Sequence, residues 1–291
     1  MPPIRVSAPA KINFHLHITG KRVDGYHLLE SLVGFAEFGD MVECVPADEL
    51  TLTVNGPFAA TLGDNSGNLV ICAAEALRAY TGCTKGAAIV LHKYIPIGAG
   101  LGGGSSDAAA ALKGLVQLWQ LQLADETLYT IAATLGSDVP ACLKHRPAWL
   151  NGVGDQLSFV SLPEPGWCVL VNPNQSLLTA DVYKAFNSRF SAAEPAVTHI
   201  PDFPALVDFM RTRHNALEAS AITKIPIISG MLRQLRATAG CAIARMSGSG
   251  ATCFALYANE KSAQTAAAQL RTQGCWVQAT KLLGSNDGKT Q

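Results

Sequence analysis

The segment Ile95-Pro-Ile-Gly-Ala-Gly-Leu-Gly-Gly-Gly-Ser-Ser-Asp107 carries five glycines within seven residues. Because glycine lacks a Cβ and adopts positive φ readily, successive backbone N–H groups of such a loop can converge on one anion. An apolar, alanine-rich run over 105–119 follows and predicts a buried helix. The unpaired N–H groups and positive dipole end of that helix would add to the same site. The segment therefore predicts a cradle for a polyphosphate, with the hydroxyls of Ser105 and Ser106 at its end.

Other interpretations of this segment remain open at this point. A flexible loop whose serines only cap a helix would show the same composition. The Walker pattern needs a lysine before its Ser or Thr, whereas Ser105 follows Gly104 directly. The dinucleotide fingerprint G-x-G-x-x-G is met by Gly98, Gly100 and Gly103. That fingerprint also requires an acidic residue after a strand, and the acids at this distance, Asp125 and Glu126, fall at a predicted helix start. An NAD-dependent enzyme therefore rests on the glycine match alone.

Composition bounds the remaining function classes. The 291 residues are 48% hydrophobic and 15% charged, which predicts a folded chain of one large or two medium domains. Lys plus Arg and Asp plus Glu both number 22, so no overall charge favours nucleic acid or an anionic membrane as partner. The eight cysteines include no C-x-x-C pair, and no apolar stretch approaches membrane-spanning length. With no leader-like N-terminus, a soluble cytoplasmic protein with reduced thiols is expected.

Predicted strands and helices are interspersed without a strict βαβ rhythm, which favours an α+β fold. The segment 11–18 alternates and predicts one strand, with Lys11, Asn13, His15 and His17 on a polar face. Asn68 and Gly82 delimit a predicted helix, and Asp125 is predicted to cap the helix that ends at Leu135. The pattern is less regular after residue 148, so we predict an N-terminal domain over 1–150 and a C-terminal domain over 151–291.

Two more motifs flank the glycine loop in chain order. They are Ala8-Pro-Ala-Lys-Ile-Asn13 and Met246-Ser-Gly-Ser-Gly-Ala251. With the loop itself, they resemble the three motifs of the galactokinase, homoserine kinase, mevalonate kinase and phosphomevalonate kinase (GHMP) superfamily. The resemblance spans residues 8 to 251. It implies a two-domain fold with the active site in the cleft between domains, and ATP-dependent phosphorylation of a small-molecule alcohol.

The flanks of these motifs indicate one branch of that superfamily. Gly20-Lys-Arg-Val-Asp-Gly-Tyr-His27 and Gly136-Ser-Asp-Val-Pro140 are similar to the branch that acts on 4-diphosphocytidyl-2-C-methyl-D-erythritol. The resemblance implies phosphorylation of the 2-hydroxyl of that acceptor, giving the 2-phosphate and ADP, in the non-mevalonate route to isoprenoid precursors. The partner is then a small molecule bearing a cytidine diphosphate group. A homoserine or mevalonate kinase, and a nucleotide-binding sensor without catalysis, remain alternatives.

The resemblance also assigns residues. It makes Asp138 the base that takes the proton of the alcohol and Lys11 its cationic partner, which keeps the carboxylate ionised. Without the resemblance, Asp138 would be a turn residue or a member of a structural ion pair. The implied nucleotide contacts are Lys93, Pro96, Gly98, Gly100, Leu101, Gly102, Gly103, Gly104, Ser105 and Ser106. The implied acceptor contacts are Asn13, Tyr26, His27, Asp138, Thr179 and Gly248.

Several assignments remain open. Mg²⁺ is expected with ATP because it neutralises β- and γ-phosphate oxygens. No carboxylate cluster in the sequence fixes its ligands, and Asp107 stands where many GHMP kinases carry Asn. Thr179 and Asp181 are expected to start and cap a helix of the C-terminal half. His15 and His17 match no motif and are expected to be ordinary strand residues.

Overall fold

The computed structural model describes residues 2–62, 67–271 and 274–285 and divides the chain into two compact units. Unit 1 comprises Met1–Ala10, Gly39–Ile97 and Gly102–Lys144, and unit 2 comprises Lys11–Phe38, Gly98–Leu101 and His145–Gln291. Both units are discontinuous because the 21-residue strand β3 (His27–Ala47) contributes its first part to unit 2 and its second part to unit 1. The boundary near residue 150 remains a prediction of domain extent.

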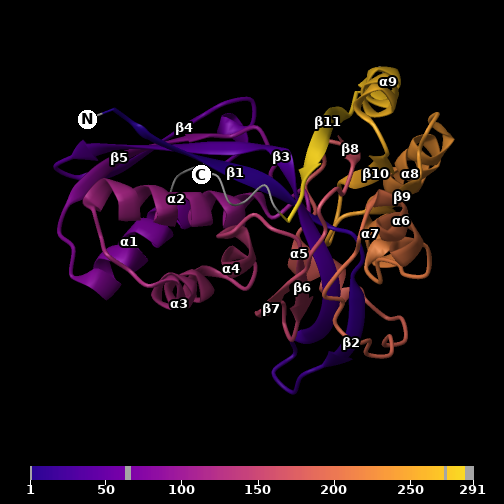
Figure 1. Cartoon of the computed structure of the whole chain (residues 1–291), viewed down its shortest axis with the longest axis horizontal. Coiled ribbons are helices and arrows are strands. Elements are labelled where there is room, and N and C mark those ends of the chain that lie inside the picture. The colour runs from indigo at the N-terminus through magenta and orange to yellow at the C-terminus, as the bar shows by residue number, and fades with distance from the viewer. Residues whose placement is uncertain (1, 63–66, 272–273, 286–291) are drawn as a thin grey trace. The chain divides into compact units, whose positions relative to one another are not determined.

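Unit 1 is a sheet covered by helices. Within it, β4 (Leu50–Asn55) runs parallel to β5 (Gly86–His92), β5 runs antiparallel to β3, and β1 (Ile4–Asn13) also pairs with β3. Four helices lie on one side of this sheet, as Figure 1 shows. They are α1 (Leu69–Thr81), α2 (Gly103–Trp119), α3 (Asp125–Leu135) and α4 (Val139–Cys142), and a short 3-10 helix covers Ala59–Thr61.

The helices of unit 1 follow from their sequences. The side chain of Asn68 caps α1 by accepting the N–H of Val70 at 3.0 Å, and Gly82 ends it with a φ of 69°. Ten of the 14 residues of α2 after Ser105 are apolar, and the helix is buried along most of its length. At the end of the helix, the Trp119 indole N–H donates to the Gly86 carbonyl at 3.0 Å. The predicted helices therefore form, although α2 begins at Gly103 rather than Ser105.

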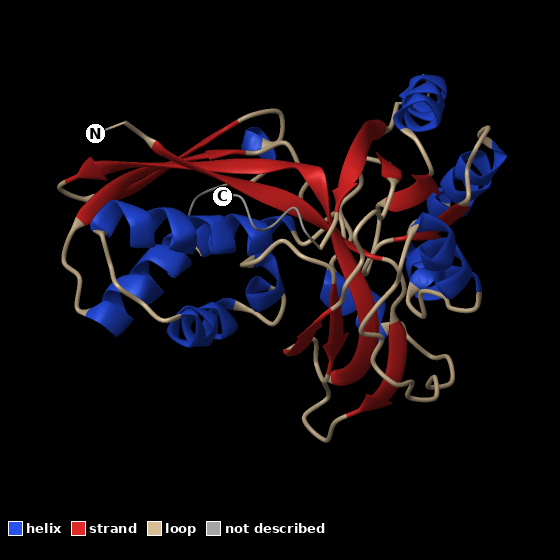
Figure 2. Cartoon of the chain, viewed as in Figure 1, coloured by secondary structure: helices blue, strands red, loops and turns tan. Residues whose placement is uncertain are grey.

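Unit 2 is an antiparallel sheet with helices and a hairpin (Figure 2). Its strand order is β3, β11 (Trp276–Leu283), β8 (Trp167–Asn172), β10 (Cys253–Tyr257) and β9 (Ile243–Met246). β2 (His17–Lys21) and β6 (Ala148–Asn151) also pair with β3, and β7 (Gln156–Phe159) pairs with β6. The helices are α5 (Thr179–Lys184), α6 (Phe203–Arg211), α7 (Glu218–Lys224), α8 (Ile227–Ala237) and α9 (Glu260–Leu270). This mixture of helix and sheet confirms the predicted α+β class.

The predicted strand over 11–18 is wrong in its middle. β1 ends at Asn13 and β2 begins at His17, because the backbone between them bonds elsewhere. Leu16 donates its N–H to the His214 carbonyl at 3.1 Å, and its own carbonyl accepts the N–H of Ala216 at 2.8 Å. The polar face is not exposed either, since Lys11, Asn13, His15 and His17 are all buried.

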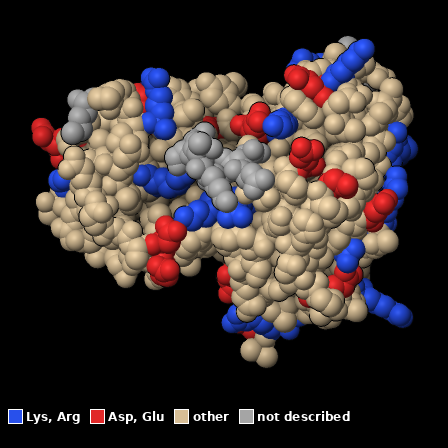
Figure 3. Space-filling model, viewed as in Figure 1, with Lys and Arg blue, Asp and Glu red and all other residues tan. Residues whose placement is uncertain are grey.

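The surface and the thiols match the sequence analysis. On the face drawn in Figure 3, acidic and basic side chains are both scattered over a largely uncharged surface, in keeping with the balanced composition. All eight cysteines are free, and burial raises the pKa of the Cys44 thiol to about 12. Within residues 2–62, 67–271 and 274–285, no helix has the length and apolar character needed to cross a bilayer.

Candidate active site

Three sequence motifs meet in unit 2 although they are far apart in the chain. The backbone N–H of Lys11 bonds to the Leu101 carbonyl at 2.8 Å. The Ser247 hydroxyl accepts the N–H of Asn13 at 3.1 Å and donates to the Gly100 carbonyl at 3.0 Å. Thr252 adds a bond from its N–H to the Ala99 carbonyl at 3.1 Å. The start of the glycine loop is therefore held between β1 and the turn that joins β9 to β10.

Glycine is required where these backbones touch. Gly100 has a φ of 72°, and a Cβ there would lie 2.5 Å from the Ser247 carbonyl oxygen and 2.6 Å from that of Gly250. Gly248 has a φ of 53°, and its Cβ would lie 2.9 Å from the Gly100 carbonyl oxygen. Both positions combine a left-handed backbone with a close approach that leaves no room for a side chain. The glycines of the two motifs thus let the loops pack against each other.

Two polar side chains complete this packing. Asn215, which the sequence analysis missed, donates from its amide to the carbonyls of Met246 and Gly248 at 2.9 and 2.8 Å. Thr179 is the first residue of α5, and its hydroxyl lies 2.8 Å from that of Ser249. The expected capping by Thr179 and Asp181 is wrong, because Leu178 occupies the N-cap position and no side chain caps the helix.

The second half of the glycine loop forms the start of α2 in unit 1. Gly102 is the N-cap residue with a φ of 61°, and Ser106 donates its N–H to the Gly102 carbonyl at 2.9 Å. The N–H groups of Gly103, Gly104 and Ser105 precede this bond and have no acceptor within the helix. They are the donors that a phosphate group would use. The Ser106 hydroxyl instead points inward, to the Pro9 carbonyl at 2.8 Å.

Lys93 lies in a buried cluster of charges with Asp40 and Asp107. Its ammonium donates to both carboxylates, at 2.7 Å to Asp107, and the second Asp40 oxygen accepts the N–H groups of Tyr94 and Ile95 at 2.5 and 2.8 Å. Burial raises the pKa of Asp107 to about 8, although the Lys93 ammonium opposes this. The cluster connects β3, the end of β5 and the first turns of α2. A direct bond from Lys93 to a nucleotide remains a prediction.

Lys11 and Asp138 belong to different units. Lys11 lies near the end of β1 and is 4% exposed, in unit 2. Asp138 is half-buried at the N-cap position of α4, in unit 1. Pro140 is the second residue of α4. The backbone N–H of this position has no partner within a helix, so a proline there costs no hydrogen bond. Their roles as base and cationic partner therefore remain predictions.

The hairpin between β2 and β3 presents Tyr26 and His27. The Tyr26 side chain is 66% exposed, and the turn is fixed by a bond from its N–H to Asp24 at 3.2 Å. The His27 ring lies 5.4 Å from the ring of Tyr183 and 5.8 Å from that of Phe186. Burial, and then the neighbouring charge of Lys21, lower the pKa of His27, so its ring is neutral near pH 7. Neither Tyr183 nor Phe186 belongs to a motif, so no sequence signal pointed to these two rings.

Comparison with known proteins identifies the family. The model of the GHMP kinases N terminal domain matches residues 68–146, and that of the GHMP kinases C terminal matches 195–274. The 4-diphosphocytidyl-2-C-methyl-D-erythritol kinase of Paramagnetospirillum magneticum is 48% identical over 285 residues, which cover 97% of this chain and 100% of that protein.

Solved structures agree with this match. A crystal structure of 4-(cytidine 5'-diphospho)-2C-methyl-D-erythritol kinase has 34% identity and a TM-score of 0.78, with 96% of this chain and 99% of that one covered. The homoserine kinase of Cytophaga hutchinsonii has a TM-score of 0.70 over 99% of this chain and 96% of its own, but 17% identity, so it shows the fold alone. The chain is an ATP-dependent small-molecule kinase with the expected fold, and it belongs to the 4-diphosphocytidyl-2-C-methyl-D-erythritol kinase family of the GHMP kinases.

Proposed function

We propose that the chain transfers the γ-phosphoryl group of ATP to the 2-hydroxyl of 4-diphosphocytidyl-2-C-methyl-D-erythritol, giving the 2-phosphate and ADP. This reaction belongs to the non-mevalonate route to isoprenoid precursors. The observation that carries the proposal is the meeting in unit 2 of β1, the glycine loop and the turn between β9 and β10. The 48% identity to a kinase named for this acceptor supports the choice of substrate.

The phosphates of ATP would bind at the N-terminus of α2. Its first N–H groups point out of the helix, and the positive end of a 17-residue helix favours negative charge. The nucleotide contacts predicted for the loop before α2 are those of Pro96, Gly98, Gly100 and Leu101. Hydrogen bonds from this loop to β1 and to the turn between β9 and β10 fix its shape. Lys93 and Ser106 are proposed to contact the nucleotide as well, and both also anchor the helix, since Ser106 bonds to β1 and Lys93 to β3.

The acceptor would be held through its cytosine and its methylerythritol. The exposed ring of Tyr26 suits stacking on a base, and a neutral His27 offers one donor and one acceptor to a base edge. Asn13, Thr179 and Gly248 are the proposed contacts to the remainder of the acceptor. Asp138 would take the proton of the 2-hydroxyl as the new O–P bond forms, and the Lys11 ammonium would offset the developing negative charge.

Mg²⁺ is proposed as the metal that accompanies ATP, where it supplies charge neutralisation at the phosphate oxygens. Among the residues that the structure describes, no group of three or more His, Cys, Asp or Glu side chains is arranged to hold a metal ion. This fits Mg²⁺, which usually keeps several waters and is bound largely through substrate phosphates. The N–H donors at the start of α2 would bind some of the phosphate oxygens and leave others free to bind Mg²⁺.

The decisive experiment is an ADP-release assay with Mg-ATP and three acceptors in parallel. These are 4-diphosphocytidyl-2-C-methyl-D-erythritol, homoserine and mevalonate. We expect turnover with the first only. Turnover with homoserine or mevalonate would keep the kinase assignment and refute the roles of Tyr26 and His27. ATP binding without turnover of any acceptor would favour a nucleotide sensor instead.

A further inference from the structure

The rings of His27, Tyr183 and Phe186 lie together, and we call them the ring cluster. Phe186 belongs to a long segment over residues 185–202, between α5 and α6, that contains no helix or strand. Ile200 is its one buried residue, so apolar burial fixes little of its path. Connections of this length without regular structure are usually functional or disordered. Phe186, near its beginning, contacts His27 and stacks with Phe190 at 6.2 Å between ring centroids.

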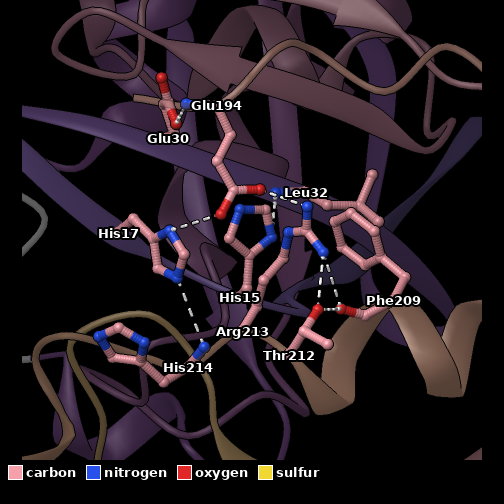
Figure 4. Close-up of polar contacts among 9 residues, drawn as sticks. All are labelled: His15, His17, Glu30, Leu32, Glu194, Phe209, Thr212, Arg213 and His214. Carbon is pink, nitrogen blue, oxygen red and sulfur yellow. Dashed lines mark hydrogen bonds and ion pairs between the residues drawn. The ribbon is translucent and has the colours of Figure 1, made fainter. Parts of the chain in front are cut away.

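Polar contacts hold the middle of this segment to the β2–β3 hairpin. Ser191 donates its N–H to the Ile18 carbonyl at 2.8 Å, and Glu194 donates its N–H to the Glu30 carboxylate at 2.9 Å. The Glu194 carboxylate forms an ion pair with Arg213 and lies 4.0 Å from Nδ1 of His17. Figure 4 shows Glu194 between His17 and Arg213, with Glu30 at its backbone.

The Arg213 side chain is held in place by contacts that do not involve Glu194. Its guanidinium lies over the Phe209 ring at 3.9 Å and donates to the Phe209 carbonyl at 3.1 Å and the Thr212 hydroxyl at 3.0 Å (Figure 4). The ring of His15 packs edge-on against the same Phe209 at 5.4 Å. An exposed ion pair gains little because both side chains must be ordered. Here the arginine is preorganised, so that cost is reduced.

His17 lies close to Glu194, although its Nδ1 makes no hydrogen bond within the described part of the chain. The N–H of His214 reaches Nε2 of His17 at 3.5 Å, so in the neutral ring the proton lies on Nδ1, which faces Glu194. His17 and Glu30 are opposite residues in the register of β2 and β3, while Lys21 and His27 are opposite each other nearer the turn. The hairpin that presents His27 to Phe186 thus also holds Glu194, at its other end.

We propose that Glu194 and Arg213 are positioning residues for acceptor binding. Their ion pair fastens segment 185–202 to the turn after α6, and the next residue of that turn, His214, bonds to Leu16 and His17 at the base of the hairpin. The pair thereby holds Phe186 against His27. The inference rests on the proposed function, in which His27 of the ring cluster contacts the base of the acceptor. Neither residue would touch the acceptor. Their loss should loosen the segment and weaken acceptor binding without changing ATP binding or the chemical step.

The test compares Glu194→Ala with Asp208→Ala, which removes the carboxylate of the exposed Arg211–Asp208 pair on α6 and serves as matched control. Hydrogen exchange of the ligand-free protein is measured first. We expect the Ser191 and Glu194 amides to exchange at least about tenfold faster in Glu194→Ala, since local opening governs their exchange. Glu194→Gln should be closer to wild type, because its amide oxygen still accepts from Arg213. Asp208→Ala should match wild type.

Steady-state kinetics then distinguish a role in positioning the acceptor site from a purely structural role. Glu194→Ala should raise the acceptor KM about tenfold and leave the ATP KM and kcat within about twofold. Arg213→Met should behave likewise, and the double variant should add little, because the two residues act as one contact. Unchanged exchange in Glu194→Ala, or faster exchange with an unchanged acceptor KM, would overturn the proposal. A wild-type protein that turns over none of this acceptor would instead refute the proposed function and, with it, the role of the ring cluster.

Discussion

At the scale of single residues, Asp138 is the side chain on which the chemistry depends most. Asp138→Asn removes the base but keeps the size and the position at the start of α4. We expect a folded protein that binds ATP and turns over at least about a hundredfold more slowly. Asp125→Asn is the control, because Asp125 is an exposed partner of Lys144 in the same unit. Near-normal kcat in Asp138→Asn would remove this residue from the base role.

His15 should make the protein sensitive to acid. Its Nδ1 accepts the Leu32 N–H at 3.0 Å, and burial, with the charge of His17 next, lowers its pKa to about 2. Below about pH 6.5 the unfolded chain binds a proton that folded His15 refuses, so stability falls as pH falls, by about 1.4 kcal/mol per pH unit. Urea unfolding at pH 7.5 and 5.0 measures this slope. His15→Asn, whose amide oxygen replaces Nδ1, should flatten it.

The control for this slope is His199→Asn, because the His199 side chain is exposed. This variant should keep the wild-type acid sensitivity. An equal slope in His15→Asn and wild type would mean that other groups cause the loss of stability. His17 acts in the same direction, since burial also lowers its pKa, so the slope of His15→Asn need not reach zero.

Residue roles are predicted from sequence only where a motif supports them, and those roles stay predictions. His15 and His17 were predicted to be ordinary strand residues, because nothing in the local sequence shows that Phe209 packs on His15 or that Glu194 lies beside His17. Asn215 escaped for the same reason, as its two carbonyl partners lie more than 30 positions away. Such contacts depend on the tertiary fold, and alternation along one strand contains no information about them.

At the scale of elements, the packing of the glycine loop against the turn between β9 and β10 should contribute to the stability of the fold. Gly100→Ala adds a Cβ 2.5 Å from a backbone oxygen at a φ of 72°, where little can move. We expect a loss of about 2–5 kcal/mol, the sum of left-handed strain and overpacking. Gly104→Ala is the matched control, because its Cβ would lie 3.5 Å from Leu69, an ordinary contact. Equal unfolding midpoints for the two variants would contradict the packing argument.

The cluster of Lys93, Asp40 and Asp107 gives α2 a pH-dependent anchor. The raised pKa of Asp107 means that the folded protein keeps a proton that the unfolded chain releases above its ordinary pKa of about 3.9. The contribution of Asp107 to stability is therefore complete below that value and is lost as pH rises through about 8. Asp107→Asn should gain stability relative to wild type between pH 5.5 and about 8, by thermal unfolding. The exposed Asp48→Asn should not, and equal behaviour of both variants would contradict this assignment.

Elements were predictable where short-range signals decide them. For α1, the cap at Asn68 and the end at Gly82 are confirmed, and its buried face consists of Val70, Ala73, Ala74 and Leu77. The start of α3 is wrong by one residue, since Ala124 is its N-cap and Asp125 binds Lys144 instead. β1 and β2 were predicted as one strand because their break depends on His214 and Ala216, about 200 positions later. Local pattern thus gave the helices, and long-range bonds set the strand ends.

At the scale of the whole molecule, charge balance predicts how the protein meets polyanions. Its 22 basic and 22 acidic residues cancel, and Figure 3 shows both signs interspersed on the face drawn. Binding to nucleic acid requires several clustered Lys or Arg side chains that release counterions from the phosphate backbone. A chain without net charge has little of that driving force overall, so we expect phosphate recognition to come from local N–H donors such as those at the start of α2.

We therefore expect the protein to pass through a heparin column at about 0.1 M salt, a concentration at which surface charges further than about 10 Å apart are screened. The same preparation should still bind ATP, measured by calorimetry, because backbone donors and a helix dipole do not depend on net charge. Elution only at high salt would show that a basic patch dominates the surface. Binding of ATP without retention on heparin would place phosphate recognition in local donors, as proposed for the glycine-rich start of α2, and not in the net charge of the chain.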